Sequence, residues 1–275
     1  MQFTAISWNL FHGRDFPPDP ALLTWRSRLL RIAERNATHV QVNRDLLDEF
    51  AALLGEAEWD VALLQECPPR WRDPLARACD AEAHRALTSR NSLAPLRALA
   101  ARLNPDLIAS GEGGSNLILV RDEVIAERRE MTIHAGPMER RAMGFVRIAG
   151  GDSPGSGLCI ANLHASAHRP ELAAEDVLRA AEAADRWAGD SPLIFGGDLN
   201  LRPAESPELF AELRERFGLS APTAPRAIDH LLARGLETVE PAHQWEPERR
   251  ELREDGLALR LSDHAPVEAV FATPS

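Results

Sequence analysis

The chain has 275 residues, 44% of them hydrophobic, and it carries 42 acidic residues against 31 basic ones, for a formal net charge of −11. This length allows one large domain or two ordinary ones, and the apolar content is sufficient for a sizeable core. The negative charge disfavours tight nonspecific binding of duplex DNA, which relies on basic surfaces, but it is compatible with a local basic cleft or with bound cations.

The cysteine pattern and the N-terminal segment indicate the compartment. Cys67, Cys79 and Cys159 are unevenly spaced and form no CxxC pair, a pattern that fits free thiols in a reducing compartment better than a disulfide framework or a zinc site. The start, "MQFTAISWNLFHGRD", lacks the basic and apolar regions of a signal peptide. No run approaches the roughly 20 apolar residues of a membrane span. We therefore predict a soluble, cytoplasmic protein with no membrane span and no evident obligate protein partner.

Short apolar runs bounded by Gly, Pro, Asp or Asn predict strands, and longer amphipathic runs predict helices. In chain order, the predicted elements are a strand at 3–9, helices at 21–35 and 44–56, a strand at 60–66, a helix at 92–103, strands at 116–122, 143–149 and 158–164, a helix at 170–188, a strand at 192–197, a helix at 206–217, and strands at 228–233 and 266–272. The helix at 170–188 has the clearest signals, because Pro170 opens it and Gly189 follows it.

The connections between these elements show no internal repeat and no convincing linker. The segment 149–157, "AGGDSPGSG", joins two predicted strands, so we interpret it as a hairpin loop. The segment 240–256 is charged and poor in apolar residues, which predicts an exposed loop. Because helices and strands alternate along the whole chain, we expect one layered α/β domain over residues 1–275.

Polar side chains gather at the ends of the predicted strands. These residues are Asn9, Glu66, His164, Asp198 and Asn200, followed by Asp229, His230, Asp263 and His264 at the starts of the last two strands. In layered α/β proteins the strand ends are where loops assemble sites. Carboxylates, amides and imidazoles without a thiol are typical of a hard-cation site, such as Mg²⁺ or Mn²⁺ with a phosphate substrate.

Each of these residues also has a simple structural interpretation. Asn9 fits a turn, Glu66 fits a helix cap, and a lone histidine such as His164 is usually a satisfied core residue. Asp198 follows two glycines and could belong to a turn, but a turn does not explain Asn200 two residues later. The combination favours a site, because independent turns have no reason all to choose metal-binding and proton-transfer groups.

The motifs resemble those of a known superfamily. "SWN", "LLQE", "NLH", "GGDLN", "IDH" and "SDHAPV" occur in this order between residue 6 and about residue 270. They resemble the endonuclease/exonuclease/phosphatase superfamily, which includes DNase I-like nucleases, abasic-site endonucleases, sphingomyelinases and inositol polyphosphate 5-phosphatases. The resemblance implies a DNase I-like α/β/β/α sandwich of four layers, in which two facing mixed β-sheets are flanked by helices.

The resemblance also implies a metal centre. It makes Glu66 the chief ligand of Mg²⁺, or of Mn²⁺ as a substitute, with Asn9 and Asp263 beside it. It pairs His264 with Asp229, so that His264 contacts or protonates the phosphate. A carboxylate–imidazole pair of this kind fixes the tautomer and raises the pKa of the imidazole.

The remaining residues are implied to handle water and phosphate. Asp198 and Asn200 would position and activate the attacking water, and His164 would bind a phosphate oxygen or act as a second acid. Arg141, in the "RRAM" stretch, matches an arginine that faces the phosphate, although an exposed arginine is nearly as good an interpretation. The sequence leaves open which residue is the general base.

Several features depart from the familiar subgroups. Asn9 is followed by "LFHGRDFPPD" rather than an "NGxR"-like continuation, and the chain has no tyrosine. The position of a supporting glutamate before the strand at 116–122 is "GGSN", so His164 is without that partner, and Asn116 is a candidate phosphate-binding substitute. His230 could enter the site or simply pack.

These motifs predict a divalent-metal-dependent phosphoester hydrolase, foremost a phosphodiesterase or nuclease. One alternative is a phosphomonoesterase that acts on a small phosphorylated metabolite or lipid headgroup, and another is a catalytically silent binding module. The substrate would be a nucleic acid, a nucleotide or a lipid headgroup. Phe16 and Trp71 lie in the loops nearest these motifs, where they could stack on a base or cover the core.

Overall fold

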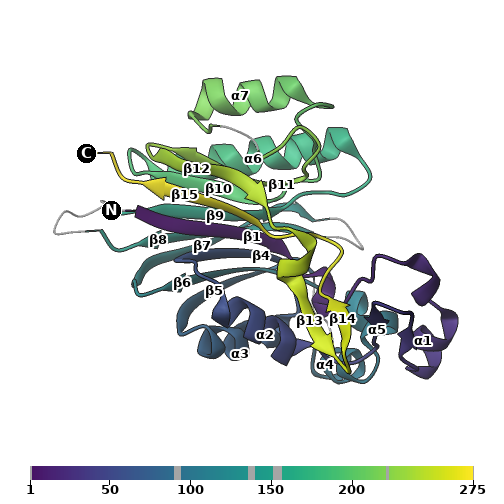
Figure 1. The fold of residues 1–275 in the computed structure, drawn as a ribbon. Helices are drawn as coiled ribbons and strands as arrows, with labels where there is room; N and C mark the ends of the chain where they lie inside the picture. The colour runs from purple at the N-terminus through teal and green to yellow at the C-terminus, as the bar shows by residue number, and fades with distance from the viewer. Residues whose placement is uncertain (1, 90–93, 136–139, 151–156, 221–222, 275) are drawn as a thin grey trace.

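The computed structural model describes residues 2–89, 94–135, 140–150, 157–220 and 223–274. Two β-sheets face each other and helices cover both outer faces (Figure 1). The first sheet has the order β12 (Glu237–Gln244), β15 (Val267–Ala272), β1 (Gln2–Asn9), β4 (Val61–Cys67), β6 (Ser115–Arg121), β5 (Ala81–Leu87). The second has the order β11 (Asp229–Arg234), β10 (Leu193–Asp198), β9 (Cys159–His164), β8 (Arg140–Ile148), β7 (Ile125–Ala135).

Three apolar clusters hold the four layers together. One lies between the sheets and includes Leu63 of β4 and Ile194 of β10. A second joins the first sheet to α2 (Leu47–Glu56) and α3 (Arg72–Ala78), and the third joins the second sheet to α6 (Pro170–Ala188) and α7 (Pro207–Phe217). Because each sheet buries both of its faces, its central strands are nearly continuous apolar runs. The predicted α/β/β/α sandwich is confirmed.

A small lobe lies at one end of the sandwich (Figure 1). It contains the helices α1 (Trp25–Leu30), α4 (Ala94–Leu103) and α5 (Pro105–Glu112), together with the short strand pairs β2 (Glu34–Arg35) with β3 (Val40–Gln41) and β13 (Glu251–Glu254) with β14 (Leu257–Arg260). Among the residues that the structure describes, no helix is long and apolar enough to cross a membrane.

All eight predicted strands are present, with ends that differ by at most three residues, but the helix predicted at 21–35 is wrong in extent. Thr24 caps the start of α1 by accepting a hydrogen bond from the Ser27 amide at 3.0 Å. Arg31, at φ +57°, adopts the left-handed conformation that ends it. The pattern missed α3, α5, β5, β7 and β12, whose apolar residues are few or not periodic.

The interpretation of 240–256 as a loop is also wrong, although most of its residues are exposed as expected. This segment contains the end of β12, a 3-10 turn at Pro247–Arg250 and strand β13. Arg250 is buried, and its guanidinium donates to the carbonyls of Leu261 and His264, both at 3.0 Å. The charged residues that suggested a loop therefore include Arg250, which is buried and holds backbone carbonyls of the segment that follows. The predicted loop at 149–157 joins β8 to β9, and these two strands are antiparallel. Residues 151–156 of this loop lie outside the described part of the chain.

A polar bridge crosses the core between the two sheets. Asn162 of β9 donates from Nδ2 to the carbonyls of Leu64 and Leu117 in the opposite sheet, both at 3.0 Å. Gln65 donates from Nε2 to Asn162 Oδ1 at 2.8 Å. Buried polar groups are costly unless they are paired, so this bridge favours one register between the sheets. It fixes the residue after Gln65, which is Glu66, relative to the end of β9.

Candidate active site

The strand pairings bring the predicted site residues to one edge of the sandwich. In the first sheet β1 and β4 are parallel, and Asn9 pairs with Gln65, directly before Glu66. In the second sheet Asp198 pairs with His164 of the parallel strand β9 and with Asp229 of the antiparallel strand β11. The carboxyl ends of parallel strands meet at the same edge, which is where such folds place ligand sites.

The glycines before Asp198 are required by close packing within the sheet, not by a turn. A Cβ on Gly197, which has φ +127°, would lie 1.9 Å from the Leu163 carbonyl oxygen. A Cβ on Gly196 would lie 2.5 Å from the His230 carbonyl oxygen. Strand β10 can therefore reach its neighbours only with glycine at both positions. Asp198 is the last residue of this strand and is buried.

Glu66 lies at an irregularity in β4. The register between β4 and β6 shifts between Leu64 and Cys67, and Glu66 itself has φ +48°, which is uncommon for a residue with a long side chain. Its carboxylate oxygens lie 3.3 Å from His12 Nε2 and 4.0 Å from His164 Nδ1. The structure therefore gives His164 a carboxylate neighbour, although the sequence position that supplies one in related nucleases is absent.

The turn that carries Asp263 and His264 is fixed by the first strand. Ser262 Oγ donates to the Asn9 carbonyl at 2.6 Å and accepts from the His264 amide at 3.1 Å. Trp8 Nε1 donates to the His264 carbonyl at 3.0 Å, and the buried Arg250 donates to the same carbonyl. These bonds explain how residues from opposite ends of the chain hold one geometry.

Asp198 lies at the centre of the cluster. Its Oδ2 accepts from Asn9 Nδ2 at 2.9 Å and lies 3.5 Å from His164 Nε2 and 3.9 Å from His264 Nε2. Its Oδ1 accepts from the backbone amide of Asn200 at 3.0 Å. Two histidines and two amide groups therefore surround one buried carboxylate. Such a carboxylate can exchange a proton with a ligand that enters between the histidines.

Burial and neighbouring charge give Asp198 and His264 complementary proton affinities. Burial, reinforced by the nearby Asp229, raises the pKa of Asp198 to about 7. Burial alone lowers the pKa of His264, but Asp229 Oδ2 lies 2.8 Å from its Nδ1, and the surrounding carboxylates raise that pKa to about 10. Burial, followed by the charge of Arg141, lowers the pKa of His164 well below its ordinary value. His264 is thus cationic and His164 neutral near pH 7.

The residues that the resemblance proposed as metal ligands offer oxygen donors. Burial raises the pKa of Asp263, and the neighbouring His264 lowers it. The negative charge of Glu66 also raises this pKa, so the carboxylates of Asp263 and Glu66 are close enough to repel each other. Asn9 Oδ1 accepts one hydrogen bond, from the Phe11 amide at 3.0 Å, and an amide oxygen has a second lone pair. Carboxylate and amide oxygens are the ligands that Mg²⁺ and Mn²⁺ prefer, so these three residues fit such an ion.

A second group of potential ligands lies beside the first. Ligand atoms of Asp198, Asp229 and His264 all lie within 4.8 Å of one another. Two of these atoms already form the hydrogen bond between Asp229 and His264. Glu66 and Asp263 likewise have neighbours, His12 beside Glu66, His264 beside Asp263 and Arg14 near both, so the assignment of an ion to the Glu66 side of the cluster stays a prediction.

The two predicted phosphate-binding residues lie on neighbouring strands of opposite sheets. The charge of Arg141, at the start of β8, lowers the pKa of both His12 and His164 after the larger effect of burial, so this charge lies near the two histidines. Asn116 is buried on β6 and donates to the Ala142 carbonyl at 2.7 Å. Asn116 therefore contacts the backbone next to Arg141, and its role toward phosphate stays a prediction.

The structure adds two residues that the sequence reasoning missed. His12 contacts Glu66, and its Nδ1 is buried without a hydrogen-bond partner among the described residues. Burial lowers the pKa of Arg14, while Asp106 and then Glu66 and Asp263 raise it, so this guanidinium lies near the carboxylates. Both residues come three to five positions after Asn9, within "LFHGRD". The only sequence signal was their position directly after a strand that ends on a site residue.

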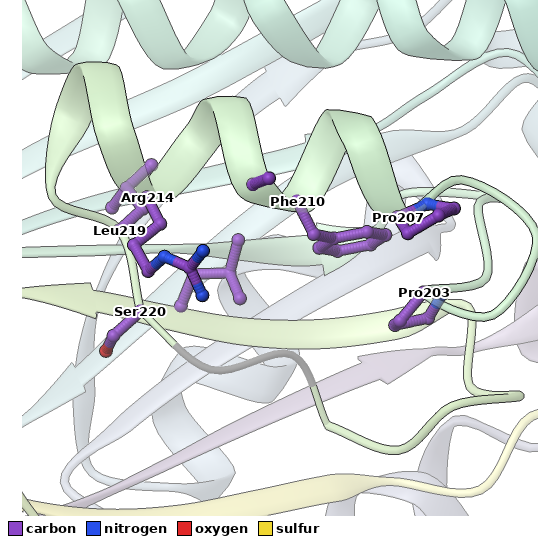
Figure 2. Close-up of a pocket in the computed structure, with 8 residues that line it drawn as sticks. Pro203, Pro207, Phe210, Arg214, Leu219 and Ser220 are labelled. Atoms are coloured by element: carbon purple, nitrogen blue, oxygen red, sulfur yellow. The ribbon is translucent and has the colours of Figure 1, made fainter.

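Three residues whose roles were open belong to the packing around the cluster. His230 is buried, its Nε2 lies 3.0 Å from the Leu201 carbonyl, and its ring centroid lies 5.0 Å from that of Phe210. Phe210 lines a recess beneath α7, together with Pro203, Pro207 and Leu219 (Figure 2). Trp71 is fully buried against Phe50, while Phe16 is partly buried and packs edge-on against Phe11.

The family model for the endonuclease/exonuclease/phosphatase family matches residues 6–264. The chain belongs to this family. Its members are typically phosphoester hydrolases and generally use divalent metals. The resemblance seen in the motifs is therefore confirmed. No curated protein matches the sequence significantly.

Solved structures show the same fold at low sequence identity. A family protein from Bacteroides thetaiotaomicron has a TM-score of 0.64 and 15% identity, covering 100% of this chain and 99% of its own. A mannosyl-6-phosphatase from the same species has a TM-score of 0.61 and 15% identity, with 98% and 99% covered. The human Nocturnin catalytic domain has a TM-score of 0.62 and 14% identity, with 99% and 95% covered. At these identities the likeness establishes the fold alone.

Proposed function

We propose that this protein is a divalent-metal-dependent hydrolase of phosphoesters, with phosphodiesters as its foremost substrates. The observation that carries the proposal is the placement of the Asp198 carboxylate between His164 and His264, beside the oxygen donors of Glu66 and Asp263. A phosphoester hydrolase needs a base for water, positive charge for the phosphoryl oxygens and a proton for the leaving oxygen. This cluster offers a group for each need.

The protein's own residues divide these tasks by their protonation. Asp198, with its pKa raised to about 7, accepts the proton of the attacking water, while Asn200 holds its other oxygen in place. His264, with its pKa raised to about 10, presents a cation to the phosphate and can release a proton to the leaving oxygen. Neutral His164 donates a hydrogen bond to a phosphoryl oxygen.

Glu66, Asp263 and Asn9 would hold Mg²⁺, or Mn²⁺ in its place. The ion supplies charge neutralisation and polarises the phosphoryl group when it is bound. Without a cation, the two carboxylates would repel an anionic substrate. His12 lies 3.3 Å from Glu66 and would orient that carboxylate.

Phosphomonoesters are the second candidate class, favoured by one specific observation. Arg14 lies near Glu66 and Asp263, and Arg141 lies near His12 and His164, so two guanidiniums approach the cluster from different elements. A monoester carries more negative charge than a diester, and two arginines suit it. Nucleic acids, nucleotides and lipid headgroups all contain one of these two ester types. A silent binding module is disfavoured because every group of the cluster is in place.

Removal of the metal is the direct test of the proposed chemistry. We expect the protein to hydrolyse bis-p-nitrophenyl phosphate with Mg²⁺ or Mn²⁺, and EDTA to reduce the rate to background. p-Nitrophenyl phosphate measured in parallel distinguishes diester from monoester preference, and a plasmid-nicking assay tests for nuclease activity. The Asp198→Ala protein serves as the control for contaminating enzymes. Hydrolysis that persists undiminished in EDTA would contradict the proposed metal dependence.

Asp229→Asn tests the role of the charge on His264. The variant removes the carboxylate that raises the pKa of His264 to about 10, so this imidazole loses its proton at lower pH. Loss of one charge-assisted hydrogen bond, about 1.5–3 kcal/mol, corresponds to about 10- to 100-fold slower turnover at slightly alkaline pH. The pH profile should show its alkaline limb shifted toward neutrality.

The exposed Asp190 provides the matched substitution, Asp190→Asn, for which we expect an unchanged profile. An alkaline limb at the same pH in Asp229→Asn and in the unmodified protein would show that His264 does not act as the proposed cation.

A further inference from the structure

The lobe formed by α1, α4 and α5 exposes an unusual amount of apolar surface. Of the eleven large hydrophobic side chains that are exposed in the described part of the chain, nine belong to residues 23–32 and 96–107. We call these nine the lobe surface: Leu23, Trp25, Leu29, Leu30, Ile32, Leu96, Leu99, Leu103 and Leu107. Scattered apolar residues are normal on a protein surface, whereas a contiguous group marks an interaction site.

Hydrogen bonds join the two segments that carry the lobe surface. Asn104, between α4 and α5, donates to the Arg28 carbonyl of α1 at 2.9 Å and accepts from Asn43 at 2.7 Å. Asn43 also donates to the Ser27 carbonyl at 2.9 Å. The exposed faces of α1 and of the α4–α5 corner therefore belong to one body. Trp25 is 65% exposed and the flanking Leu29 is 56% exposed, so no part of the described chain covers them.

The charge around the lobe surface is opposite to that of the whole protein. Residues 23–32 and 94–107 together contain five arginines and one acidic residue, Asp106, although the chain as a whole has a net charge of −11. Arg26 and Arg102 each reach one acid at the edge of the lobe, Glu34 at 4.0 Å and Asp45 at 3.5 Å. Helices that combine arginine with tryptophan and leucine are typical of segments that lie in the interface of an anionic bilayer.

We propose that the lobe surface is a docking site for an anionic lipid bilayer. Trp25 and the leucines would lie at the boundary between headgroups and acyl chains, and the arginines would contact lipid phosphates. A second copy of this chain is a poorer occupant. A symmetric dimer through the same surface would bring the arginines of both copies together, and like charges repel.

The lobe lies at the same end of the sandwich as the candidate active site (Figure 1). A recess of about 290 Å³ separates them, lined by Arg28 of α1, by Asp106 of α5 and by Arg14 from the loop after β1. Arg14 in turn lies near the carboxylates of Glu66 and Asp263. Docking through the lobe would therefore hold the active-site edge next to the lipid headgroups.

Vesicle flotation tests this proposal without any measurement of activity, so its result does not depend on the proposed hydrolase function. The vesicles contain phosphatidylcholine alone, or three parts phosphatidylcholine to one part phosphatidylglycerol. We expect the protein to float with the anionic vesicles, to bind the neutral ones at least about tenfold more weakly, and to dissociate as salt is raised. The double variant Leu29→Ser/Leu30→Ser should lose about tenfold or more in partition to anionic vesicles.

The chain offers a matched control for the apolar substitutions. Val124 and Val239 are exposed outside the lobe, so Val124→Ser/Val239→Ser should bind vesicles like the unmodified protein. Both variants should keep their circular dichroism spectrum and their rate on a water-soluble ester. Equal binding by the Leu29/Leu30 variant, or no binding to anionic vesicles, would overturn the proposal. A dimer in light scattering that dissociates in that variant would assign the surface to a second copy instead.

Discussion

Asp198→Asn should slow hydrolysis by about 10²- to 10⁴-fold, which is the contribution that a well-placed general base usually makes. The amide keeps the size of the carboxylate, and its single oxygen can still accept from Asn9, while the hydrogen bond from the Asn200 backbone amide to the second oxygen is lost. The amide cannot take a proton from water. The expected loss is therefore in kcat, with little change in KM.

The pH profile separates this role from a structural one. Burial and Asp229 raise the pKa of Asp198 to about 7, and the base form is the ionised one, so activity should rise as pH increases through that region. A divalent cation nearby stabilises the carboxylate and moves this acidic limb to lower pH. In Asp198→Asn the residual rate should lose the limb. Asp190→Asn, at an exposed carboxylate, should retain it. An acidic limb that survives in Asp198→Asn would assign the base to another residue.

Glu66→Gln should lower the rate by about 10³-fold at moderate Mg²⁺, because the ion contributes several kcal/mol of charge stabilisation. The substitution removes one negative charge from the proposed ligand set while keeping the shape of the side chain. We expect the concentration of Mg²⁺ that gives half-maximal activity to increase, and the heat of Mg²⁺ binding to the metal-free protein to fall. Calorimetry measures the second effect independently of substrate.

Glu58→Gln is the matched control, since Glu58 is an exposed glutamate that lies before the start of β4, at the opposite end of the strand from Glu66. It should leave metal affinity and rate unchanged. A Glu66→Gln protein that binds Mg²⁺ as tightly as the unmodified one would move the ion to the neighbouring Asp198, Asp229 and His264 group, whose ligand atoms also lie close together.

The parts of the fold that the sequence predicted are those with strong local signals. The buried strands carry uninterrupted apolar runs, and each ends on a polar residue that a core cannot accept unpaired. This is why Asn9, Glu66, His164 and Asp198 could be proposed together, and the strand pairings do bring them to one edge. The motif order made the four-layer sandwich predictable because the family model spans almost the whole chain.

The parts that were missed depend on tertiary contacts. His12 and Arg14 lie on an irregular turn with left-handed backbone at His12, which no periodicity reveals. Arg250 lies in a charged segment that resembles a solvated loop, yet its guanidinium is buried against backbone carbonyls. Strand β12 is mostly exposed on both faces, and the less exposed face of β7 carries Glu127 and Arg129 among its apolar residues, so neither strand shows the apolar alternation that marks a half-buried strand.

The hydrogen bond from Ser262 to the Asn9 carbonyl joins residues 253 positions apart, and β1 pairs along its length with β15. Contacts of such long sequence separation form late, because the chain must close a large loop before they can stabilise anything. During synthesis, the first strand and its asparagine emerge long before the turn that carries His264. A nascent chain can pair β1 with β4 early, but the other edge of β1 stays unpaired until β15 has been synthesised, and the candidate site is complete only once that strand is in place. Any folding intermediate without β15 would be both inactive and open to pairing with other chains.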